Sequence, residues 1–213
     1  MILKWMVCDV PSEQRNAFSE AQKTWSVLKE VPGFLGQCGG WDNKTSEDSA
    51  CILGFWETEE QYQSFMETVH DDVTAASQQE QTYKSLLTTR WKSLFAMPGE
   101  AESLRQTLEQ GLCIRVADCR LHEGRSSHFI EAQRSVWASG MAACSGMKGG
   151  LFVRHEEIQG RFMVLTFWED LAAHQHYMEY AFARLFRDSE AEKDLRSVHG
   201  YRLSQVEGWR VLS

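Results

Sequence analysis

Aromatic side chains are the residues of this sequence best suited to binding a ligand. The chain has 213 residues and eight of them are tryptophan. Large rings that line a pocket between a sheet and helices would bind a planar polycyclic or quinone-like molecule by stacking and apolar burial. The candidate ligand-binding residues are Trp5, Trp25, Phe34, Trp41, Trp56 and Phe65 in the first half, and Trp168 and Tyr177 in the second. The alternative is that these rings only fill the core.

His70 is a candidate acid–base residue. It lies where a helical pattern breaks, and an imidazole exchanges protons near neutral pH. Asp71 and Asp72 follow it directly. The alternative is therefore an ordinary solvated histidine at a helix end.

No residue pattern indicates a metal or phosphate site. The six cysteines form no C-x-x-C pair and have no spacing with histidine that suits zinc. We expect them to be reduced thiols that pack as small apolar groups. Neither a Gly-x-Ser-x-Gly motif nor a Walker or dinucleotide-binding motif occurs. We expect no metal and no cofactor.

Composition and charge exclude several classes of protein. Hydrophobic residues make up 43% of the chain and charged residues 24%, which is typical of a globular protein. A net charge of -8 argues against a nucleic-acid partner. No apolar run approaches the roughly 20 residues that span a bilayer, and Lys4 interrupts the apolar start, unlike in a signal peptide. We therefore expect a cytoplasmic protein that binds neither nucleic acid nor membrane.

An internal repeat organises the chain. Phe18-Ser-Glu-Ala-Gln22 recurs as Phe129-Ile-Glu-Ala-Gln133, at an offset of 111. Ile52-Leu-Gly-Phe-Trp-Glu57 recurs as Val164-Leu-Thr-Phe-Trp-Glu169, at an offset of 112. We predict two ferredoxin-like repeats, 1–96 and 111–213, joined by a connector, 97–110, that carries a short helix. Phe182 corresponds to His70, so a role for His70 would be confined to the first repeat.

Each repeat alternates strand and helix patterns in the order β-α-β-β-α-β, the split-βαβ motif. In the first repeat we predict strands at 2–10, 34–41, 49–57 and 83–94, with helices between them. In the second we predict strands at 112–121, 145–156, 160–169 and 199–211, and helices at 123–139 and 170–197, the latter with a break. Gly36-x-x-Gly39-Gly40 aligns with Gly146-x-x-Gly149-Gly150 at an offset of 110, and glycines inside strands mark bulges or close backbone contacts.

Both faces of the predicted strands are apolar. Trp5 and Val7 lie on one face of the first strand, while Met6 and Cys8 lie on the other. An isolated ferredoxin-like domain would expose one sheet face and alternate apolar with polar residues. We therefore expect an α+β fold in which the tandem duplicated units pack as an intramolecular pseudo-dimeric α/β barrel. Because such a barrel closes within one chain, we expect a monomer with pseudo-two-fold symmetry, or a dimer through the outer helices.

This pattern resembles the dimeric α/β-barrel superfamily, and within it the antibiotic-biosynthesis-monooxygenase-like domains. Three segments of the first repeat, residues 2–11, 33–41 and 55–57, resemble the YdbC-like bacterial proteins. The superfamily includes cofactor-free oxygenases, haem-degrading enzymes, small isomerases and non-enzymatic stress proteins. The resemblance therefore predicts the fold and leaves the reaction open.

The resemblance also suggests positions for a haem site. Tandem-domain haem proteins related to chlorite dismutase use a histidine on the helical layer of the second domain. His174 would be that residue here, because it aligns with Tyr62 on a face expected to look inward. The haem-degrading branch uses an Asn, a Trp and a His where this chain has Cys8, Phe65 and a displaced His70, so we do not expect that chemistry.

Three functional hypotheses follow. The first is a small-molecule-binding α/β-barrel protein that acts as a cofactor-independent monooxygenase on an aromatic or quinone-like substrate, with His70 and His174 as candidate catalytic residues. The substrate would itself donate the electron to oxygen. The second is a non-enzymatic, stress-related ligand-binding or interaction module. The third is a haem-binding protein.

Overall fold

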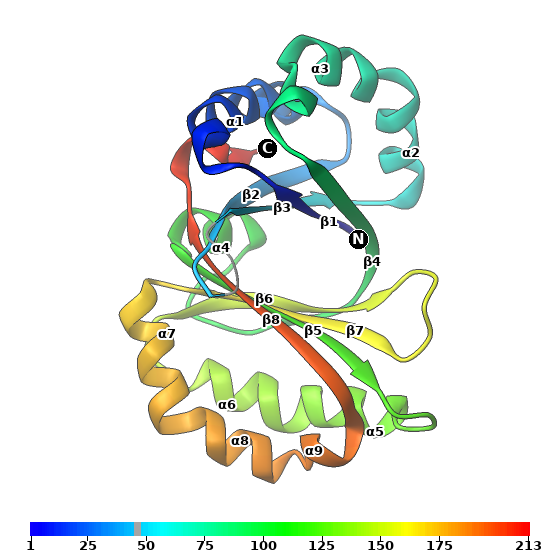
Figure 1. Ribbon diagram of the computed structural model, residues 1–213. Helices are drawn as coiled ribbons and strands as arrows, with labels where there is room; N and C mark the ends of the chain where they lie inside the picture. Colours follow the sequence, from blue (N-terminus) through cyan, green and yellow to red (C-terminus); the bar gives the residue numbers. More distant parts are fainter. Residues whose placement is uncertain (45–47) are drawn as a thin grey trace. The chain divides into compact units, whose positions relative to one another are not determined.

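In the computed structural model, which describes residues 1–44 and 48–213, strands and helices follow the predicted order twice (Figure 1). Two units are distinguished: unit 1 comprises Met1–Trp91 and Leu203–Ser213, and unit 2 comprises Lys92–Arg202. Strands β4 (Ser85–Met97) and β8 (Leu195–Gln205) each contain residues of both units. The unit boundaries thus fall inside strands, whereas the repeat boundaries at 96 and 111 rest on sequence similarity and stay a prediction.

The sheet of unit 1 is built around β3 (Ser49–Trp56). This strand pairs antiparallel with β1 (Ile2–Asp9) on one side and with β2 (Phe34–Asp42) on the other. β4 adjoins β1, and β2 also pairs with the end of β8 and with β9 (Val211–Leu212). The elements that cover one face are α1 (Arg15–Lys23), α2 (Glu59–Thr68) and α3 (His70–Ser77), with 3-10 turns at Thr24–Glu30 and Gln79–Thr82 (Figure 1).

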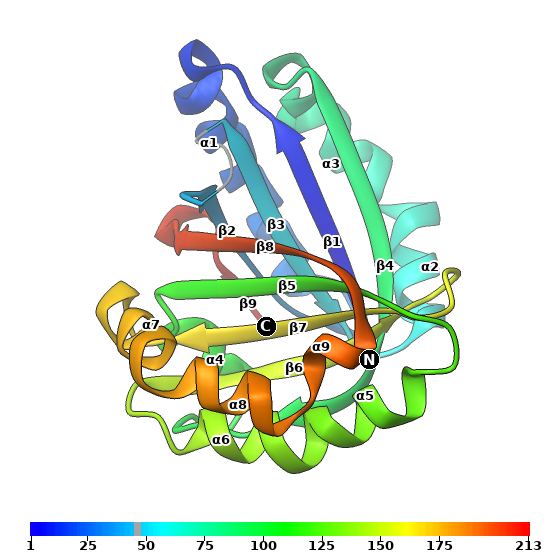
Figure 2. The ribbon, with the colours of Figure 1, turned by 60° about the horizontal axis from the view of Figure 1, so that its bottom comes forward.

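The sheet of unit 2 repeats this plan around β7 (Arg161–Trp168). β7 pairs antiparallel with β5 (Cys113–Leu121) and with β6 (Met147–His155). The helices of the unit are α4 (Leu104–Gln110), α5 (Ser126–Ala132), α6 (Ala138–Ala142), α7 (Leu171–Tyr177), α8 (Ala183–Asp188) and α9 (Ala191–Asp194) (Figure 2). Two π-helical turns interrupt them, Gln133–Trp137 between α5 and α6 and Met178–Phe182 between α7 and α8. Helix α4 is the short helix predicted in the connector.

Equivalent ring contacts confirm the sequence repeat. Trp56 stacks on Phe65 with ring centroids 4.6 Å apart and an interplanar angle of 26°. At an offset of 112, Trp168 stacks on Tyr177 at 4.7 Å and 26°. In both units the end of a central strand is thus fixed against the following helix by the same aromatic pair.

The glycine alignment at an offset of 110 is wrong. Gly36 pairs with Phe55 and Gly149 pairs with Phe167, and each of these two glycines follows a bulge in its strand. Gly36 therefore corresponds to Gly149, at an offset of 113. Their φ angles are 147° and 143°, in the region that favours glycine. The bulge predicted near Gly149 is thus present, whereas in the first repeat the bulge lies at Gly36 and the paired Gly39 and Gly40 mark the alternative, a close approach to the backbone of Cys51 and Ser204.

The last helix and strand of the second repeat are also displaced from their predicted positions. Glu190 has a φ of 51°, which ends the helical segment that stops with α8 at Asp188. After the single turn of α9, strand β8 begins at Leu195, earlier than the predicted 199. Helical periodicity gave no signal for this left-handed residue.

Burial on both strand faces is confirmed. All eight residues of β7 and seven of the eight in β3 are buried, which agrees with the apolar residues on both faces of these strands. Among the described residues, no helix has the length and hydropathy needed to cross a membrane.

Candidate functional site

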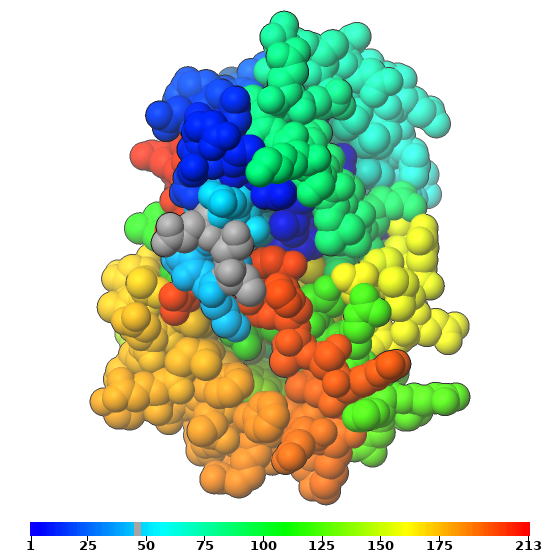
Figure 3. Space-filling model, viewed as in Figure 1, coloured from blue at the N-terminus to red at the C-terminus, as the bar shows by residue number. Residues whose placement is uncertain are grey.

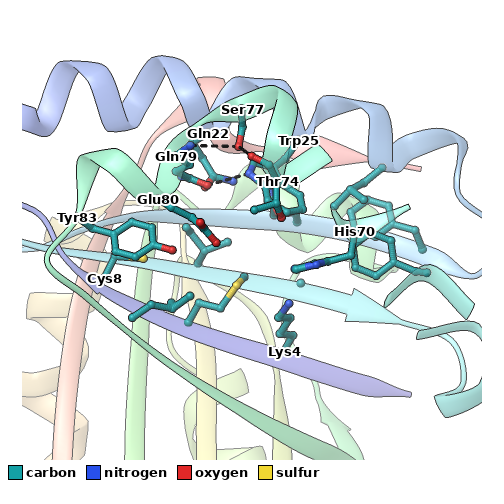
Figure 4. A pocket seen from close by; sticks show the side chains of 18 of the residues that line it. Lys4, Cys8, Gln22, Trp25, His70, Thr74, Ser77, Gln79, Glu80 and Tyr83 are labelled. Atoms are coloured by element: carbon teal, nitrogen blue, oxygen red, sulfur yellow. Dashed lines mark hydrogen bonds between the residues drawn. The ribbon is translucent and has the colours of Figure 1, made fainter. Parts of the chain in front are cut away.

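The candidate site is a cavity of about 100 Å³ inside unit 1, between the sheet and its helices (Figure 4). Side chains of β1 and β3 form its floor, and its walls come from the segment 22–34 and from α3 with the turn that follows it. These two wall segments contact each other and lie side by side at the surface (Figure 3). Leu86, which is 45% exposed, also lines the cavity and marks where it meets solvent.

Gly54 on β3 leaves the space beside Lys4. The two residues are directly paired across β1 and β3. A Cβ atom at Gly54 would lie 3.8 Å from Trp56 Nε1 and 4.0 Å from Lys4 Cβ, so a side chain there would occupy the cavity without a clash. The equivalent pair in unit 2 is Arg115 and Thr166. A missing side chain therefore contributes to the cavity of unit 1.

Four of the predicted ligand-binding rings line this cavity: Trp25, Phe34, Trp56 and Phe65. The ring of Phe34 packs edge-on against that of Trp56, with ring centroids 5.2 Å apart, and Phe65 stacks on the same tryptophan. Apolar rings held in this way can accept a planar molecule by stacking.

Trp25 is held by a chain of glutamine side chains. Its Nε1–H donates to Gln79 Oε1 at 2.8 Å, and Gln79 Nε2–H donates to Gln22 Oε1 at 2.7 Å. Both glutamines are buried, and Figure 4 shows this chain on the helical side of the cavity. Buried amides that satisfy each other fix the orientation of the ring.

The structure does not bring the other predicted rings to this cavity. Trp5 lies on the opposite face of β1 from Lys4, as strand alternation requires. Trp41 packs on Trp209 at 5.2 Å and beneath Arg15, whose guanidinium lies 3.9 Å from its ring centroid. In unit 2, the predicted rings Trp168 and Tyr177 stack on each other and line neither the cavity of unit 1 nor the cavity of about 80 Å³ in unit 2.

Lys4 places an amine in the apolar cavity. Burial lowers its pKa from 10.5 to about 8. Its Nζ lies 3.8 Å from Met66 Sδ and 5.8 Å from the centroid of the Tyr62 ring. Figure 4 shows its side chain pointing into the cavity. Below pH 8 it is a partly desolvated ammonium suited to an anionic or electron-rich ligand.

His70 lies on the cavity wall between two rings. Its ring centroid is 5.8 Å from that of Trp25 and 5.7 Å from that of Phe65. Its Nδ1 is 2.9 Å from Asp71 Oδ1, and a hydrogen bond donated from Nδ1–H would leave Nε2 as a proton acceptor. The side chain is 23% exposed and points into the cavity (Figure 4). His70 is thus placed to exchange a proton with a bound molecule.

The thiols of this chain are not placed for nucleophilic chemistry. All six cysteines are free and five are buried. Cys8 lines the cavity, but burial raises its pKa to about 12, so the thiol stays protonated near neutral pH.

His174 is buried, 5% exposed, against the rings of Trp168 and Tyr177 at 5.8 and 6.0 Å. Like those rings, it lines neither the cavity of unit 1 nor that of unit 2. Among residues 1–44 and 48–213, no three histidine, cysteine, aspartate or glutamate side chains are grouped so that they could hold a metal ion.

Lys4, Gly54 and the two glutamines are absent from the sequence-based candidates. For Lys4 a signal existed: it shares the helix-facing side of its strand with Met6 and Cys8, where a charge is unusual. For Gly54 the signal was the Gly-to-Thr difference between the repeated motifs.

Comparisons with known proteins connect this site to one family. Residues 2–91 match a domain of unknown function, DUF4937. The Bacillus subtilis protein YdbC, described as uncharacterized, is 36% identical over 90 residues, which cover 42% of this chain and 76% of YdbC. The matched part contains the whole lining of the unit 1 cavity.

Solved structures match over nearly the whole chain. A proposed monooxygenase from Lactobacillus acidophilus has a TM-score of 0.76 at 10% identity, covering 99% of this chain and 95% of its own. One from Fusobacterium nucleatum has a TM-score of 0.77 at 10% identity, with coverages of 100% and 94%. An anthrone oxidase-like protein has a TM-score of 0.71 at 9% identity, with coverages of 97% and 91%. At such identities these matches show the fold alone, which is the expected dimeric α/β barrel.

Proposed function

The chain belongs to the family of the Bacillus subtilis protein YdbC, and we propose that it binds an electron-rich aromatic molecule in the unit 1 cavity and oxidises it with molecular oxygen. The substrate class is a phenol that is converted to a quinone. The observation that carries the proposal is Lys4, an ammonium within a cavity lined by Trp25, Trp56 and Phe65. Similarity of fold to an anthrone oxidase-like protein supports the same reaction class by analogy.

The reaction needs only oxygen and the substrate. A phenol and O₂ give a para-quinone and water, so the phenol supplies all the electrons. One oxygen atom enters the ring, and the other leaves as water with two hydrogens of the substrate. The first electron transfer is easier from a phenolate than from a phenol, so the site has to favour the ionised substrate.

The side chains of unit 1 are suited to that ionisation. His70 accepts the phenol proton, and the Lys4 ammonium stabilises the resulting phenolate in a mainly apolar cavity, where charges interact more strongly than in water. The same imidazolium then returns its proton to the peroxide formed when superoxide adds to the ring. The stacked rings and the Trp25–Gln79–Gln22 chain orient the aromatic plane.

Oxygen uptake with 1-naphthol as the probe tests this function. We expect one O₂ consumed per naphthoquinone formed, and one labelled oxygen atom in the quinone when labelled O₂ is supplied. Lys4→Met should lower kcat/KM about 100-fold. The exposed Lys84→Met is the matched control and should leave it unchanged. Binding of naphthol without oxygen uptake would refute the oxidase and favour a non-enzymatic binding protein.

The pH profile gives a second measurement on the same proposal. Because the ammonium form of Lys4 is required and its pKa is about 8, kcat/KM should fall above pH 8. A profile that stays level to pH 10 would remove Lys4 from the mechanism.

A further inference from the structure

Unit 2 contains a second cavity, of about 80 Å³, at the place equivalent to the first. Four of its lining residues are the repeat counterparts of residues that line the cavity of unit 1, at an offset of 111. These pairs are Lys4 and Arg115, Met6 and Ala117, Cys8 and Cys119, and Gln22 and Gln133. The two cavities therefore occupy equivalent places in the two repeats, and the differences between their lining residues indicate different ligands.

Gln133 shows the clearest difference. It is 3% exposed, and its Oε1 has no hydrogen-bond partner within the described part of the chain. Its counterpart Gln22 accepts a hydrogen bond from Gln79, which lies in the turn before β4. In unit 2 the helix before β8 places Ala191 on the cavity instead, and alanine has no donor to offer. Leaving a buried acceptor unpaired costs about 1–3 kcal/mol, which a ligand with a hydrogen-bond donor would recover.

Trp137 supplies the complementary group. It is 7% exposed and lines the cavity, and its Nε1–H has no acceptor among the described residues. Gln133 and Trp137 are the first and last residues of a π-helical turn, and Phe182 on the facing wall ends the other one. Such turns are rare and recur at functional sites. One donor and one acceptor, both buried, thus border the same cavity.

Arg115 adds a positive charge. No carboxylate of residues 1–44 or 48–213 forms an ion pair with it, and its guanidinium lies 5.9 Å from the centroid of the Phe182 ring. An arginine can form two parallel hydrogen bonds with a carboxylate, which the amine of Lys4 cannot. The remaining lining is apolar and aromatic, including Phe129 and Met141.

We propose that the unit 2 cavity binds a single-ring aromatic carboxylate that carries a hydroxyl group. The carboxylate lies against Arg115 and accepts the Trp137 Nε1–H, and the hydroxyl donates to Gln133 Oε1. The cavity is small, which selects a single ring. Val198 lines it and is 55% exposed, so one edge of the ligand can extend towards solvent. This site is independent of the oxidation proposed for unit 1.

Calorimetric titration of the full-length protein with 3- and 4-hydroxybenzoate, benzoate and phenol tests the site. We expect at least one hydroxybenzoate isomer to bind at one site per chain, about tenfold more tightly than benzoate or phenol. Arg115→Met should weaken that hydroxybenzoate about tenfold or more and leave phenol unchanged. Gln133→Met should reduce the preference for hydroxybenzoate over benzoate to about one. The exposed Lys84, which lines neither cavity, provides the control: Lys84→Met should leave the affinities for hydroxybenzoate and for phenol unchanged.

Two further variants guard against loss of folding as the explanation. Arg115→Lys keeps the charge and should lose part of the affinity for hydroxybenzoate. Trp137→Phe keeps a ring but removes the N–H donor, so it should weaken the binding of hydroxybenzoate and of benzoate. Equal affinity of these variants and the wild type for hydroxybenzoate would overturn the proposal. So would a loss of hydroxybenzoate binding in Lys4→Met, or the absence of binding by all four probes.

Discussion

Replacing Lys4 with methionine should stabilise the folded protein at pH 7, although it removes a residue of the proposed site. Methionine has a side chain of similar length and no charge. Burial lowers the pKa of Lys4 from 10.5 to about 8, and unfolding returns it to its ordinary value. Because one pKa unit corresponds to about 1.4 kcal/mol, the Lys4 ammonium destabilises the folded state by up to about 3 kcal/mol.

The stabilisation by Lys4→Met should depend on pH, because the pKa of Lys4 differs between the folded and unfolded states. Below pH 8 Lys4 is charged in both states, and the folded state carries the full penalty. Between about pH 8 and 10.5 the unfolded chain binds the proton while the folded protein does not, so stability rises with pH. The stabilisation by Lys4→Met should therefore be up to about 3 kcal/mol at pH 7 and should approach zero near pH 10.5.

Urea denaturation of wild type and variant at pH 7 and pH 10, followed by tryptophan fluorescence, measures this difference. Lys84→Met is the control, because Lys84 is exposed and its replacement should change stability little at either pH. If Lys4→Met were no more stable than Lys84→Met at pH 7, or gained equally at both pH values, Lys4 would not be a desolvated amine. The proposed role in stabilising a phenolate would then lose its basis.

Three other perturbations probe different parts of the molecule. Gly54→Leu should fill the unit 1 cavity and abolish naphthol binding in calorimetry, while a melting temperature close to that of the wild type shows that the fold is kept. Asp118→Ala should lower the free energy of unfolding by about 3 kcal/mol, because Arg161 is 9% exposed and would lose carboxylate contacts of 3.0 and 2.6 Å; a loss below about 1 kcal/mol in urea denaturation would contradict this. Cys144 is the one half-buried thiol of the six, all of which are described, so it should react first with Ellman's reagent, and fast modification of several thiols in the native protein would be inconsistent with their burial.

The repeat and the order of its elements could be predicted because the same physical constraints act twice. A large ring at the end of a buried strand needs a partner on the next helix, and the pairs Trp56–Phe65 and Trp168–Tyr177 meet that need identically. Such constraints leave matching apolar residues at matching spacings, which a sequence displays directly.

Of the site, the sequence analysis predicted four of the rings and His70. Residue type indicated an aromatic cavity, but the side of the strand decides which rings reach it, and Trp5 is on the other side. Trp25 reaches the cavity because Gln79, which is distant in sequence, accepts its Nε1–H and in turn donates to Gln22. Gly54 contributes to the cavity because it has no side chain. The propensity of a single residue for helix or strand does not reveal such a space. The polar part of the site depends on such pairings between distant segments.

The division of unit 1 into two sequence segments has a consequence for biosynthesis. Residues 203–213 complete this unit: Val211 pairs with Gln37, whose side chain also donates to the Trp209 carbonyl at 3.1 Å, and Trp209 is fully buried against Phe18. Unit 2 is one continuous stretch of chain. During translation, unit 1 therefore cannot complete its core until its last strand has been synthesised. Unit 2 is complete in sequence earlier and can fold first. Premature termination near residue 200 would leave an aggregation-prone β2 edge, and chaperones would be expected to retain the nascent chain for that interval.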